Sequence, residues 1–269
     1  MKPGLTGTEL NRHLYFAQEL AQAAGAILLK RSKRHNEIRY KGRVNLVTSA
    51  DMASQKYIIK TIENKYPEHS ILAEEAAARE RGSLYRWIID PLDGTTNYAH
   101  GFPFYCVSIA LEYRGEIKIG VVYDPVREEL FTARFGGGAR LNGRKIGVTS
   151  ESRLTHALLA TGFPYDIGAT KEDNLDNYIF FARRSRGIRR AGSAALDLCY
   201  VACGRCDGFW ELKLSPWDTA AAKLIVEEAG GRVTDFDGKK FSIYNRYIIA
   251  SNGKVHNQIM KVLARKSQK

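Results

Sequence analysis

The sequence predicts a layered α/β fold, and three features of the 269-residue chain support this prediction. Helical periodicity marks both ends, at residues 9–32 and 254–264. Residues 106–133 are rich in β-like runs, and from about residue 150 short strands alternate with helices. Because helices bury their apolar stripes against sheets, we expect alternating layers around a large core.

The first half is expected to contain two helices followed by strands. Apolar residues recur at helical spacing from Leu10 to Leu28, and the second helix stops at Pro67, which cannot continue it. Residues 114–116 (Arg-Gly-Glu) have the composition of a hairpin turn between two β-like runs. The elements in chain order are helices at 9–32 and 50–66 and strands at 71–73, 106–113, 117–123 and 129–133.

Strands and helices alternate in the expected second half. The helix that begins at Trp217 ends at Gly230 and Gly231, since glycine readily adopts the left-handed conformation that closes a helix. The pattern changes near residue 148 without a linker, so we expect two tightly joined halves, 1–147 and 148–269. The elements in chain order are strands at 157–161, 209–212, 233–234 and 247–250 and helices at 174–183, 193–202, 217–229 and 254–264.

The composition excludes disordered and membrane-spanning classes of protein. Charged residues make up 26% of the chain and hydrophobic ones 44%, and no apolar run is long enough to span a membrane. Residues 1–8 lack the pattern of a signal peptide, so a cytoplasmic protein is expected. The net charge of +12 suits anionic partners, but we favour a basic surface without a specific partner. Five arginines between residues 183 and 190 form a more suggestive local cluster.

The four cysteines, Cys106, Cys199, Cys203 and Cys206, are expected to be structural thiols. Cys203 and Cys206 have the spacing of a zinc or redox pair. No second pair and no nearby histidine accompanies them, so the zinc signal is weak. A disulfide between these two cysteines stays open as an alternative.

Residues 87–97, Trp-Ile-Ile-Asp-Pro-Leu-Asp-Gly-Thr-Thr-Asn, are the most informative segment. Because a proline follows Asp90, this residue is expected at the carboxyl end of a buried strand. Asp93 stands before Gly94, which allows a sharp turn, and Thr95 can open a short helix. Two carboxylates this close repel each other unless a cation such as Mg²⁺ lies between them. A helix N-terminus suits a phosphate group, so the segment predicts a metal and phosphate site.

Three more acidic residues are candidates for the same site. Glu74 ends a strand as Asp90 does, and two strand-end carboxylates can meet at one edge of a sheet. Asp218 lies in the first turn of a helix, where it could equally be a charge that complements the helix dipole. Glu211 ends a strand, and an exposed surface charge is its simplest interpretation.

These motifs resemble those of the inositol monophosphatase family of Mg²⁺-dependent, lithium-sensitive phosphatases. Residues 90–97, Asp-Pro-Leu-Asp-Gly-Thr-Thr-Asn, are similar to the family's first signature. Residues 217–222, Trp-Asp-Thr-Ala-Ala-Ala, and the following 228–231 are similar to the second. Glu74 matches an acidic residue upstream of the first signature, and 192–195, Gly-Ser-Ala-Ala, match a segment that lines the substrate site. The likeness runs in order along essentially the whole chain.

The resemblance implies a two-metal site. Glu74, Asp90 and the backbone carbonyl of Leu92 would hold the first Mg²⁺, and Asp90, Asp93 and Asp218 would hold the second. Such a pair of ions positions a water nucleophile and cancels charge on the phosphoryl and leaving oxygens. Most of these ligands belong to the half 1–147.

The resemblance also implies catalytic and substrate-binding roles. Glu74 with Thr95 would activate a water, with Asp93 as the third catalytic residue, and a loop containing Lys41 would close over the site and help to place a weaker third Mg²⁺. The backbone N–H groups of Gly94 and Thr95 would hold the phosphate. The implied substrate-binding residues are Gly94, Thr95, Thr96, Arg190, Gly192, Ser193, Ala194, Glu211 and Asp218.

The fold that the resemblance implies is an α-β-α-β-α sandwich with the site between the two halves, and a homodimer is expected on the same ground. The leading function is hydrolysis of a small phosphorylated polyol or sugar, inositol-1-phosphate first. One alternative is fructose-1,6-bisphosphatase activity, alone or as a second activity, because Arg189 and Arg190 could meet a second phosphate. The other is a regulatory relative that binds RNA or RNA polymerase.

Three positions depart from the family's pattern. Ala73 and Ala222 stand where the family often has glycine, and Asn45 stands where it often has aspartate. These positions concern packing and loop closure. None of them is a predicted metal ligand, so the prediction of activity stands.

Overall fold

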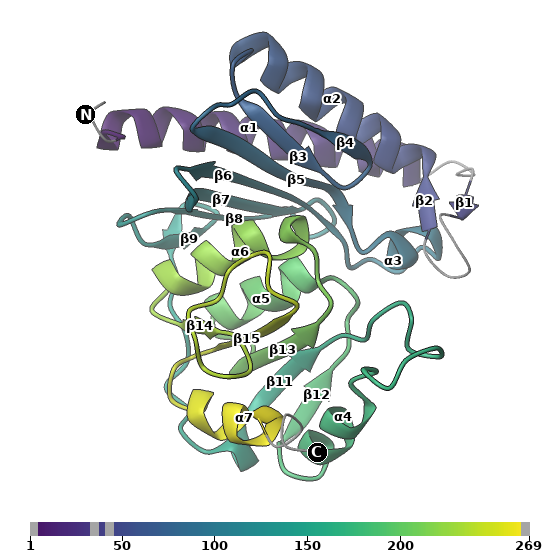
Figure 1. Ribbon diagram of the computed structural model, residues 1–269, viewed down its shortest axis with the longest axis vertical. Coiled ribbons are helices and arrows are strands. Elements are labelled where there is room, and N and C mark those ends of the chain that lie inside the picture. The colour runs from purple at the N-terminus through teal and green to yellow at the C-terminus, as the bar shows by residue number, and fades with distance from the viewer. Residues whose placement is uncertain (1–4, 33–37, 41–45, 265–269) are drawn as a thin grey trace.

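The computed structural model describes residues 5–32, 38–40 and 46–264. These residues form layers in the order helix, sheet, helix, sheet, helix, as Figure 1 shows from top to bottom. The predicted α-β-α-β-α sandwich is therefore confirmed. Lys41 and Asn45, to which loop closure was assigned, lie outside the described residues.

The larger sheet has eight strands in the order β10-β9-β8-β7-β6-β5-β3-β4. Its neighbours are antiparallel except β3 and β5, which run parallel, so Ala73 at the end of β3 pairs with Ile89. This pairing brings the residues that follow Ala73 and Ile89 to the same edge. The strands are β3 (Ser70–Ala73), β4 (Ala76–Arg79), β5 (Tyr85–Asp93), β6 (Cys106–Tyr113), β7 (Glu116–Asp124), β8 (Glu129–Arg134), β9 (Ala139–Leu141) and β10 (Arg144–Lys145).

Helices α1 (Gly7–Ser32) and α2 (Ser49–Lys65) cover the outer face of the larger sheet (Figure 1). The apolar stripe of α1 packs with α2 and with the buried Trp87 of β5 in one cluster. α2 starts at a capping box, in which Thr48 and Asp51 each bind the other's backbone N–H. This cap holds Asp51 close to the end of β5.

The smaller sheet has five strands in the order β12-β11-β13-β15-β14. β11 runs parallel to β12 and β13, whereas β15 is antiparallel to β13 and β14. Phe181 of α4 and Ile259 of α7 pack on its outer face with Trp210 of β13. The elements are β11 (Leu158–Thr161), β12 (Gly187–Arg189), β13 (Gly208–Leu212), β14 (Arg232–Thr234), β15 (Tyr247–Ser251), α4 (Leu175–Ala182) and α7 (His256–Leu263).

Helices α5 (Ala194–Ala202) and α6 (Pro216–Glu228) form the layer between the two sheets (Figure 1). α6 lies unusually close to β7, since a Cβ on Gly120 would stand 2.4 Å from the carbonyl oxygen of Ala221. Glycine allows this approach because it has no side chain. Asp218 is one helical turn before Ala221, so the contact also sets the position of Asp218 over the sheet.

Several short elements differ from the sequence-based prediction. β4, β9, β10 and β12 were not predicted, and the polar stretch 38–48 contains the paired strands β1 (Ile38–Tyr40) and β2 (Leu46–Thr48). These strands have two to four residues, too few for a periodic pattern, and neighbouring strands supply their pairing. The predicted turn at Asn142 and Gly143 is confirmed, and it joins β9 to β10.

Two composition-based predictions concern the described residues directly. No helix among them is both long and apolar enough to cross a membrane. All four cysteines are free thiols, and three of them are buried. The expectation of structural thiols therefore agrees with the structure, and Cys203 and Cys206 form no disulfide in it.

Replacing Gly120 with alanine should destabilise the protein by about 1–3 kcal/mol, because the added methyl group would force α6 away from β7. Urea unfolding of the purified protein measures this loss. Gly147→Ala is the matched control, because its Cβ would meet its nearest neighbour, the Ala229 carbonyl oxygen, at an ordinary 3.6 Å. Equal stabilities of the two variants would show that the contact between α6 and β7 is not tight.

Candidate active site

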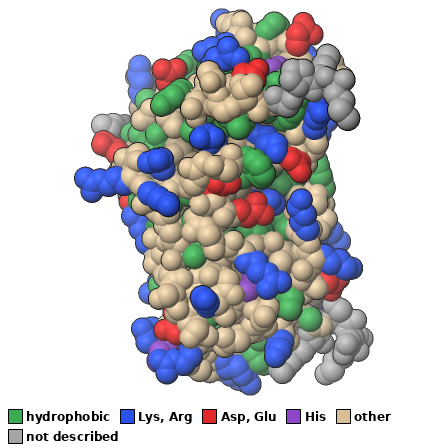
Figure 2. Space-filling model, turned by 90° about the vertical axis from the view of Figure 1, so that its left-hand side faces the viewer, with side chains coloured by type: hydrophobic (Ala, Val, Ile, Leu, Met, Phe, Trp, Pro, Cys, Tyr) green, Lys and Arg blue, Asp and Glu red, His purple; other side chains and the backbone are tan. Residues whose placement is uncertain are grey.

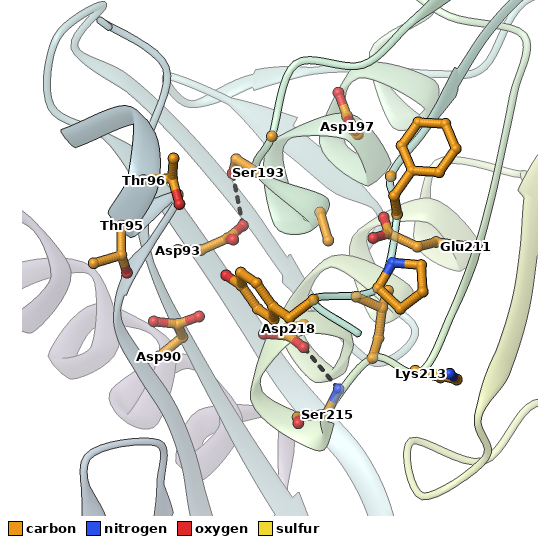
Figure 3. A pocket seen from close by; sticks show the side chains of 18 of the residues that line it. Asp90, Asp93, Thr95, Thr96, Ser193, Asp197, Glu211, Lys213, Ser215 and Asp218 are labelled. Carbon is orange, nitrogen blue, oxygen red and sulfur yellow. Dashed lines mark hydrogen bonds between the residues drawn. The ribbon is translucent and has the colours of Figure 1, made fainter. Parts of the chain in front are cut away.

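Every residue that was selected from the sequence as a site residue lines one cavity of about 380 Å³ between the two sheets (Figure 3). They are Glu74, Asp90, Leu92, Asp93, Gly94, Thr95, Thr96, Arg190, Gly192, Ser193, Ala194, Glu211 and Asp218. Among the described residues, no histidine or cysteine lines the cavity. A Ser–His or Cys–His pair is therefore not available there.

Glu74 and Asp90 come together because their strands are parallel. β3 ends at Ala73 beside Ile89 of β5, and the backbone N–H of Glu74 donates to the Ile89 carbonyl at 3.3 Å. Glu74 thus follows β3, and Asp90 lies near the end of the adjacent, parallel β5 (Tyr85–Asp93). Both residues line the same cavity, as expected of two carboxylates near strand ends.

An irregularity in β5 places Asp93 on the cavity as well. The pairing of β5 with β6 shifts register between Asp90 and Asp93, so both side chains reach the same cavity. Gly94 follows with φ of +95°, and a Cβ there would stand 2.9 Å from a backbone oxygen. Glycine is therefore required at this turn, which starts α3 (Thr95–Ala99).

Asp93 is held by the N-terminus of α5. Its Oδ2 accepts a hydrogen bond from the Ser193 hydroxyl at 2.6 Å (Figure 3). The same oxygen accepts one from the Ala195 N–H at 2.8 Å, and the Cys106 thiol lies 3.8 Å away. A helix N-terminus favours a negative charge, so this position suits an ionised carboxylate. No hydrogen bond to Oδ1 comes from the described residues.

Asp90 and Asp218 are held in the same way. Asp90 accepts at Oδ1 from the Leu92 N–H at 2.9 Å, and Asp218 accepts at Oδ2 from the Ser215 N–H at 2.7 Å (Figure 3). Within the described chain, the second oxygen of each carboxylate has no hydrogen-bond partner. Each of the three aspartates therefore has one anchored oxygen and one that can coordinate a cation.

Burial and mutual repulsion act on these carboxylates. Burial raises the pKa of Asp90 well above its usual range, and the charges of Glu74, Asp93 and Asp218 raise it further. The pKa of Asp218 is likewise raised by burial first and by Asp93 second. The pKa of Asp93 is also raised by burial, although its hydrogen bonds from α5 oppose the shift. Such a group of like charges favours a bound cation.

The charge balance of the cavity leads to the same conclusion. Its lining has seven acidic side chains and two basic ones, Arg190 and Lys213. A phosphate group would be repelled from such a surface unless cations lay between. As the side chains stand, no three acidic, histidine or cysteine groups in the described ranges are close enough to share an ion. A divalent cation would have to draw the unanchored oxygens together.

Thr95 is positioned by a residue from the first layer of helices. Its hydroxyl lies 3.3 Å from Oδ1 of Asp51 and 3.1 Å from the carbonyl oxygen of Leu92. Since its hydrogen is donated to one of these acceptors, the Thr95 oxygen keeps lone pairs for another donor. Sequence analysis did not connect Asp51 with Thr95, because 44 residues separate them.

Asn97 joins the two halves of the protein at the site. Its side-chain N–H groups donate to the carbonyl oxygens of Phe104 at 2.7 Å and Ala191 at 2.8 Å. Gly192 has φ of +89°, and a Cβ there would press against the Asn97 side chain. The metal-site turn and the substrate segment that begins at Gly192 are therefore held together directly.

Glu211 lies on the other side of the cavity from Asp90 and Thr95 (Figure 3). It is 8% exposed, which corrects the simpler interpretation of an exposed surface charge. Burial, and then the charge of Asp93, raise the pKa of Glu211 to about 8, while Arg190 opposes the shift. Gly162 leaves space for it, because a Cβ there would stand 2.1 Å from the Glu211 Oε1.

The arginine cluster is divided by β12. Arg190 lines the cavity, whereas Arg189 is an exposed strand residue whose guanidinium donates to the neighbouring Ile188 carbonyl. The expectation that both arginines could meet a substrate phosphate is therefore kept for Arg190 alone. Adjacent residues of a strand point to opposite faces.

Asp197 and Tyr165 are among the residues of the cavity that sequence analysis missed. Asp197 follows Ser193 by one helical turn in α5, and this spacing could have revealed it. Tyr165 lies in the loop after β11 and lines the cavity, although 60% of the residue is exposed. Its place could not be read from the sequence, because β11 and β13 are neighbours only in the folded sheet.

The comparisons with known proteins agree with this geometry. Residues 9–269 match the model of the inositol monophosphatase family. An inositol-1-monophosphatase from Synechocystis is 42% identical over 98% of this chain and 92% of its own. The Nus factor SuhB of Pseudomonas aeruginosa is 43% identical over 93% of this chain and 95% of its own. The structure of an inositol monophosphatase from Anabaena superposes with a TM-score of 0.88 at 43% identity, covering 95% of this chain and 96% of that one.

The pKa of Glu211 predicts a pH-dependent stability. Between its usual value of 4.5 and about 8, the folded protein keeps a proton that the unfolded chain releases, so raising the pH through this window lowers the free energy of unfolding. The side chain of Glu211→Gln has no proton to release, so its free energy of unfolding does not fall with pH in this way. The melting temperature of the metal-free variant should therefore exceed that of the unaltered protein by an amount that grows from pH 5 to pH 8.

Thermal unfolding in the presence of a chelator measures this difference. Glu68→Gln, the same change at an exposed position, is the control. A difference between variant and unaltered protein that stays constant with pH would contradict the assigned pKa.

Proposed function

This chain belongs to the inositol monophosphatase family and is a phosphoric monoester hydrolase, and we propose that it hydrolyses inositol-1-phosphate with Mg²⁺ as its metal. Membership of the family implies a divalent metal cofactor. The choice of Mg²⁺ and of the substrate rests on the residues of the cavity.

The observation that carries the proposal is the set of three aspartates, Asp90 buried and Asp93 and Asp218 partly buried, each with one anchored and one unpartnered oxygen among the described residues. Hard carboxylate and carbonyl oxygens are the ligands that Mg²⁺ prefers, whereas zinc sites favour nitrogen and sulfur. Glu74, Asp90 and the Leu92 carbonyl would hold one ion. Asp90, Asp93 and Asp218 would hold a second, and the weaker third ion, assigned to the loop at Lys41, concerns residues outside the described ranges.

When bound, Mg²⁺ would supply electrostatic stabilisation of the phosphoryl oxygens and the leaving oxygen. The chain itself would supply the other participants. Glu74 would accept a proton from the attacking water. The oxygen of Thr95, whose hydrogen is committed to Asp51 or Leu92, would accept a hydrogen bond from the same water. The N–H groups of Gly94 and Thr95, with Thr96 beside them, would hold the phosphate.

The far side of the cavity suits an alcohol with several hydroxyl groups. Glu211 is a buried acceptor there, and the small residues Gly192, Ser193 and Ala194 leave space beside it. The oxygens of a carboxyl group accept hydrogen bonds from hydroxyl groups whether or not the group carries a proton, so a polyol would satisfy Glu211. This chemistry supports inositol-1-phosphate over an ester with an apolar alcohol.

Fructose-1,6-bisphosphate is the second substrate candidate, as the sole activity or as a dual one. Arg190 is exposed, lines the cavity and forms no hydrogen bond or ion pair with any described residue. A guanidinium group of this kind can bind a phosphate through two N–H groups. It would meet the second phosphate of such a substrate.

A regulatory function is the alternative from another class, because relatives about as similar as the phosphatases are named Nus factor SuhB. Binding of RNA or RNA polymerase would use a surface outside the cavity. Figure 2 shows Lys and Arg spread over the face in view rather than gathered in one patch, which favours a generally basic surface. RNA binding that weakens with salt and survives Asp93→Asn would support the regulatory function.

Three further points remain proposals: the homodimer, the cytoplasmic location, and the division at residue 147 into a metal-binding half and a half that carries the substrate segment. For the division, the strands of the larger sheet end at Lys145 and those of the smaller begin at Leu158.

Asp93→Asn should lower kcat on every phosphate ester by about 100-fold or more, because it removes a charged ligand. The fold should persist, since the amide oxygen can still accept the hydrogen bonds of Ser193 and Ala195. Phosphate release at saturating Mg²⁺ and a thermal melt test both statements. Asp176→Asn, at an exposed position in α4, is the control. Near-normal turnover of the Asp93 variant would contradict the proposed role of Asp93 as a metal ligand.

Substrate choice is tested by phosphate release from inositol-1-phosphate and fructose-1,6-bisphosphate, side by side, with and without lithium. We expect release from inositol-1-phosphate that requires Mg²⁺. If the bisphosphate is also hydrolysed, Arg190→Ala should lower its kcat/KM by about ten-fold or more and leave that of inositol-1-phosphate nearly unchanged. Release from neither compound would contradict the proposed substrates.

A further inference from the structure

A second buried carboxyl group, that of Asp197, lines the same cavity as Glu211. Asp197 lies in the first turn of α5, is 3% exposed, and forms no hydrogen bond or ion pair through its side chain with any described residue. The side chain of Glu211 likewise has no such partner in the described chain. Glu211 is one of the charges that raise the pKa of Asp197, after burial itself, so the two carboxyl groups lie within electrostatic reach of each other.

A structural role does not explain this arrangement. An acidic residue in the first turn of a helix complements the dipole, but an exposed carboxylate such as Asp176 of α4 does this without being buried. The N-terminus of α5 is already occupied, because Ser193 caps it and Asp93 accepts its N–H groups. Burying an ionisable group without a partner is unfavourable. Because no described residue pairs with the Asp197 side chain, a molecule bound in the cavity could supply the partner.

The basic group near this pair does not provide that partner. Arg190 lowers the pKa of both carboxyl groups through space, but no hydrogen bond or ion pair joins it to either of them in the described structure. Figure 3 shows Asp197 and Glu211 on the side of the cavity away from Asp90 and Thr95. This is the side where the alcohol part of a phosphate ester would lie if the phosphate occupied the metal side.

We propose that Asp197 is a specificity-determining residue, which together with Glu211 accepts hydrogen bonds from the hydroxyl groups of the substrate's alcohol part. The inference rests on the proposed function and deepens it. A polyol brings several O–H donors on neighbouring carbons, enough to give each carboxylate a partner. An ester whose alcohol part carries no further hydroxyl groups would leave both carboxyl groups unpaired. A site whose buried polar groups are left unpaired discriminates strongly against such a substrate.

The test compares Asp197→Asn and Asp197→Ala with the unaltered holoenzyme on two esters. Inositol-1-phosphate carries hydroxyl groups on its alcohol part, and phenyl phosphate carries none. For Asp197→Ala we expect kcat/KM on inositol-1-phosphate to fall by about 10- to 100-fold, mainly through KM, and kcat/KM on phenyl phosphate to change less than about two-fold. Glu211→Ala should show the same selectivity, and Asp176→Asn should change neither substrate.

A thermal melt of the metal-free variants separates recognition from structural support. If Asp197 serves the substrate, Asp197→Asn should melt at the same or a higher temperature, because it removes an unpaired buried charge. A lower melting temperature with equal losses on both esters would overturn the proposal, since it would show that Asp197 supports the cavity as a whole. Unchanged kcat/KM on inositol-1-phosphate would overturn it as well.

Failure of the proposed substrate is distinguishable from failure of this inference. If the unaltered enzyme hydrolyses phenyl phosphate and fructose-1,6-bisphosphate but not inositol-1-phosphate, inositol-1-phosphate is the wrong substrate. The role of Asp197 is then tested by comparing the loss of kcat/KM on fructose-1,6-bisphosphate, which also carries hydroxyl groups, with the loss on phenyl phosphate. Hydrolysis of phenyl phosphate alone would overturn both proposals.

Discussion

Repulsion among crowded carboxylates is the constraint on which the rest of this structure depends. Asp90, Asp93 and Asp218 lie around one cavity, where desolvation raises the pKa of each, and neighbouring carboxylates raise those of Asp90 and Asp218 further. Each aspartate accepts a hydrogen bond from a backbone N–H group: Asp90 from Leu92, Asp93 from Ala195 in the first turn of α5, and Asp218 from Ser215, the N-cap residue of α6. One oxygen of each is thereby fixed, and a cation can compensate the remaining charge.

The same interactions hold the two halves together. Asp93 belongs to the larger sheet but accepts its hydrogen bonds from α5, and Asn97 donates to the carbonyl of Ala191 next to the substrate segment. A substitution at Asp93 or Asn97 should therefore also alter the position of the segment that begins at Gly192. Because a cation would relieve repulsion that exists only in the folded chain, binding of metal and stability are linked.

The two walls of the cavity carry residues of different chemistry. On one wall stand the anchored aspartates, Thr95 and the turn at Gly94, which suit a phosphate and its cations. The other wall has Glu211 and Asp197, which are buried hydrogen-bond acceptors and suit the hydroxyl groups of a substrate. If the proposed roles hold, reaction type and substrate choice depend on different residues, so relatives with the same metal site could differ in substrate.

By itself, the sequence determined the layered fold, because long periodic stretches identify helices and strands. It also identified candidate residues for a site, because residues 87–97 concentrate turn, carboxylate and hydroxyl chemistry in one local segment. Only the tertiary structure decided which distant residues join them. The parallel pairing of β3 with β5 brought Glu74 to Asp90, the cap of α2 brought Asp51 to Thr95, and the pairing of β11 with β13 placed Gly162 against Glu211. Such contacts depend on packing between layers, and no local pattern encodes them. For the same reason Asp197, an ordinary first-turn acid in sequence, became a buried and unpaired carboxyl group in the fold.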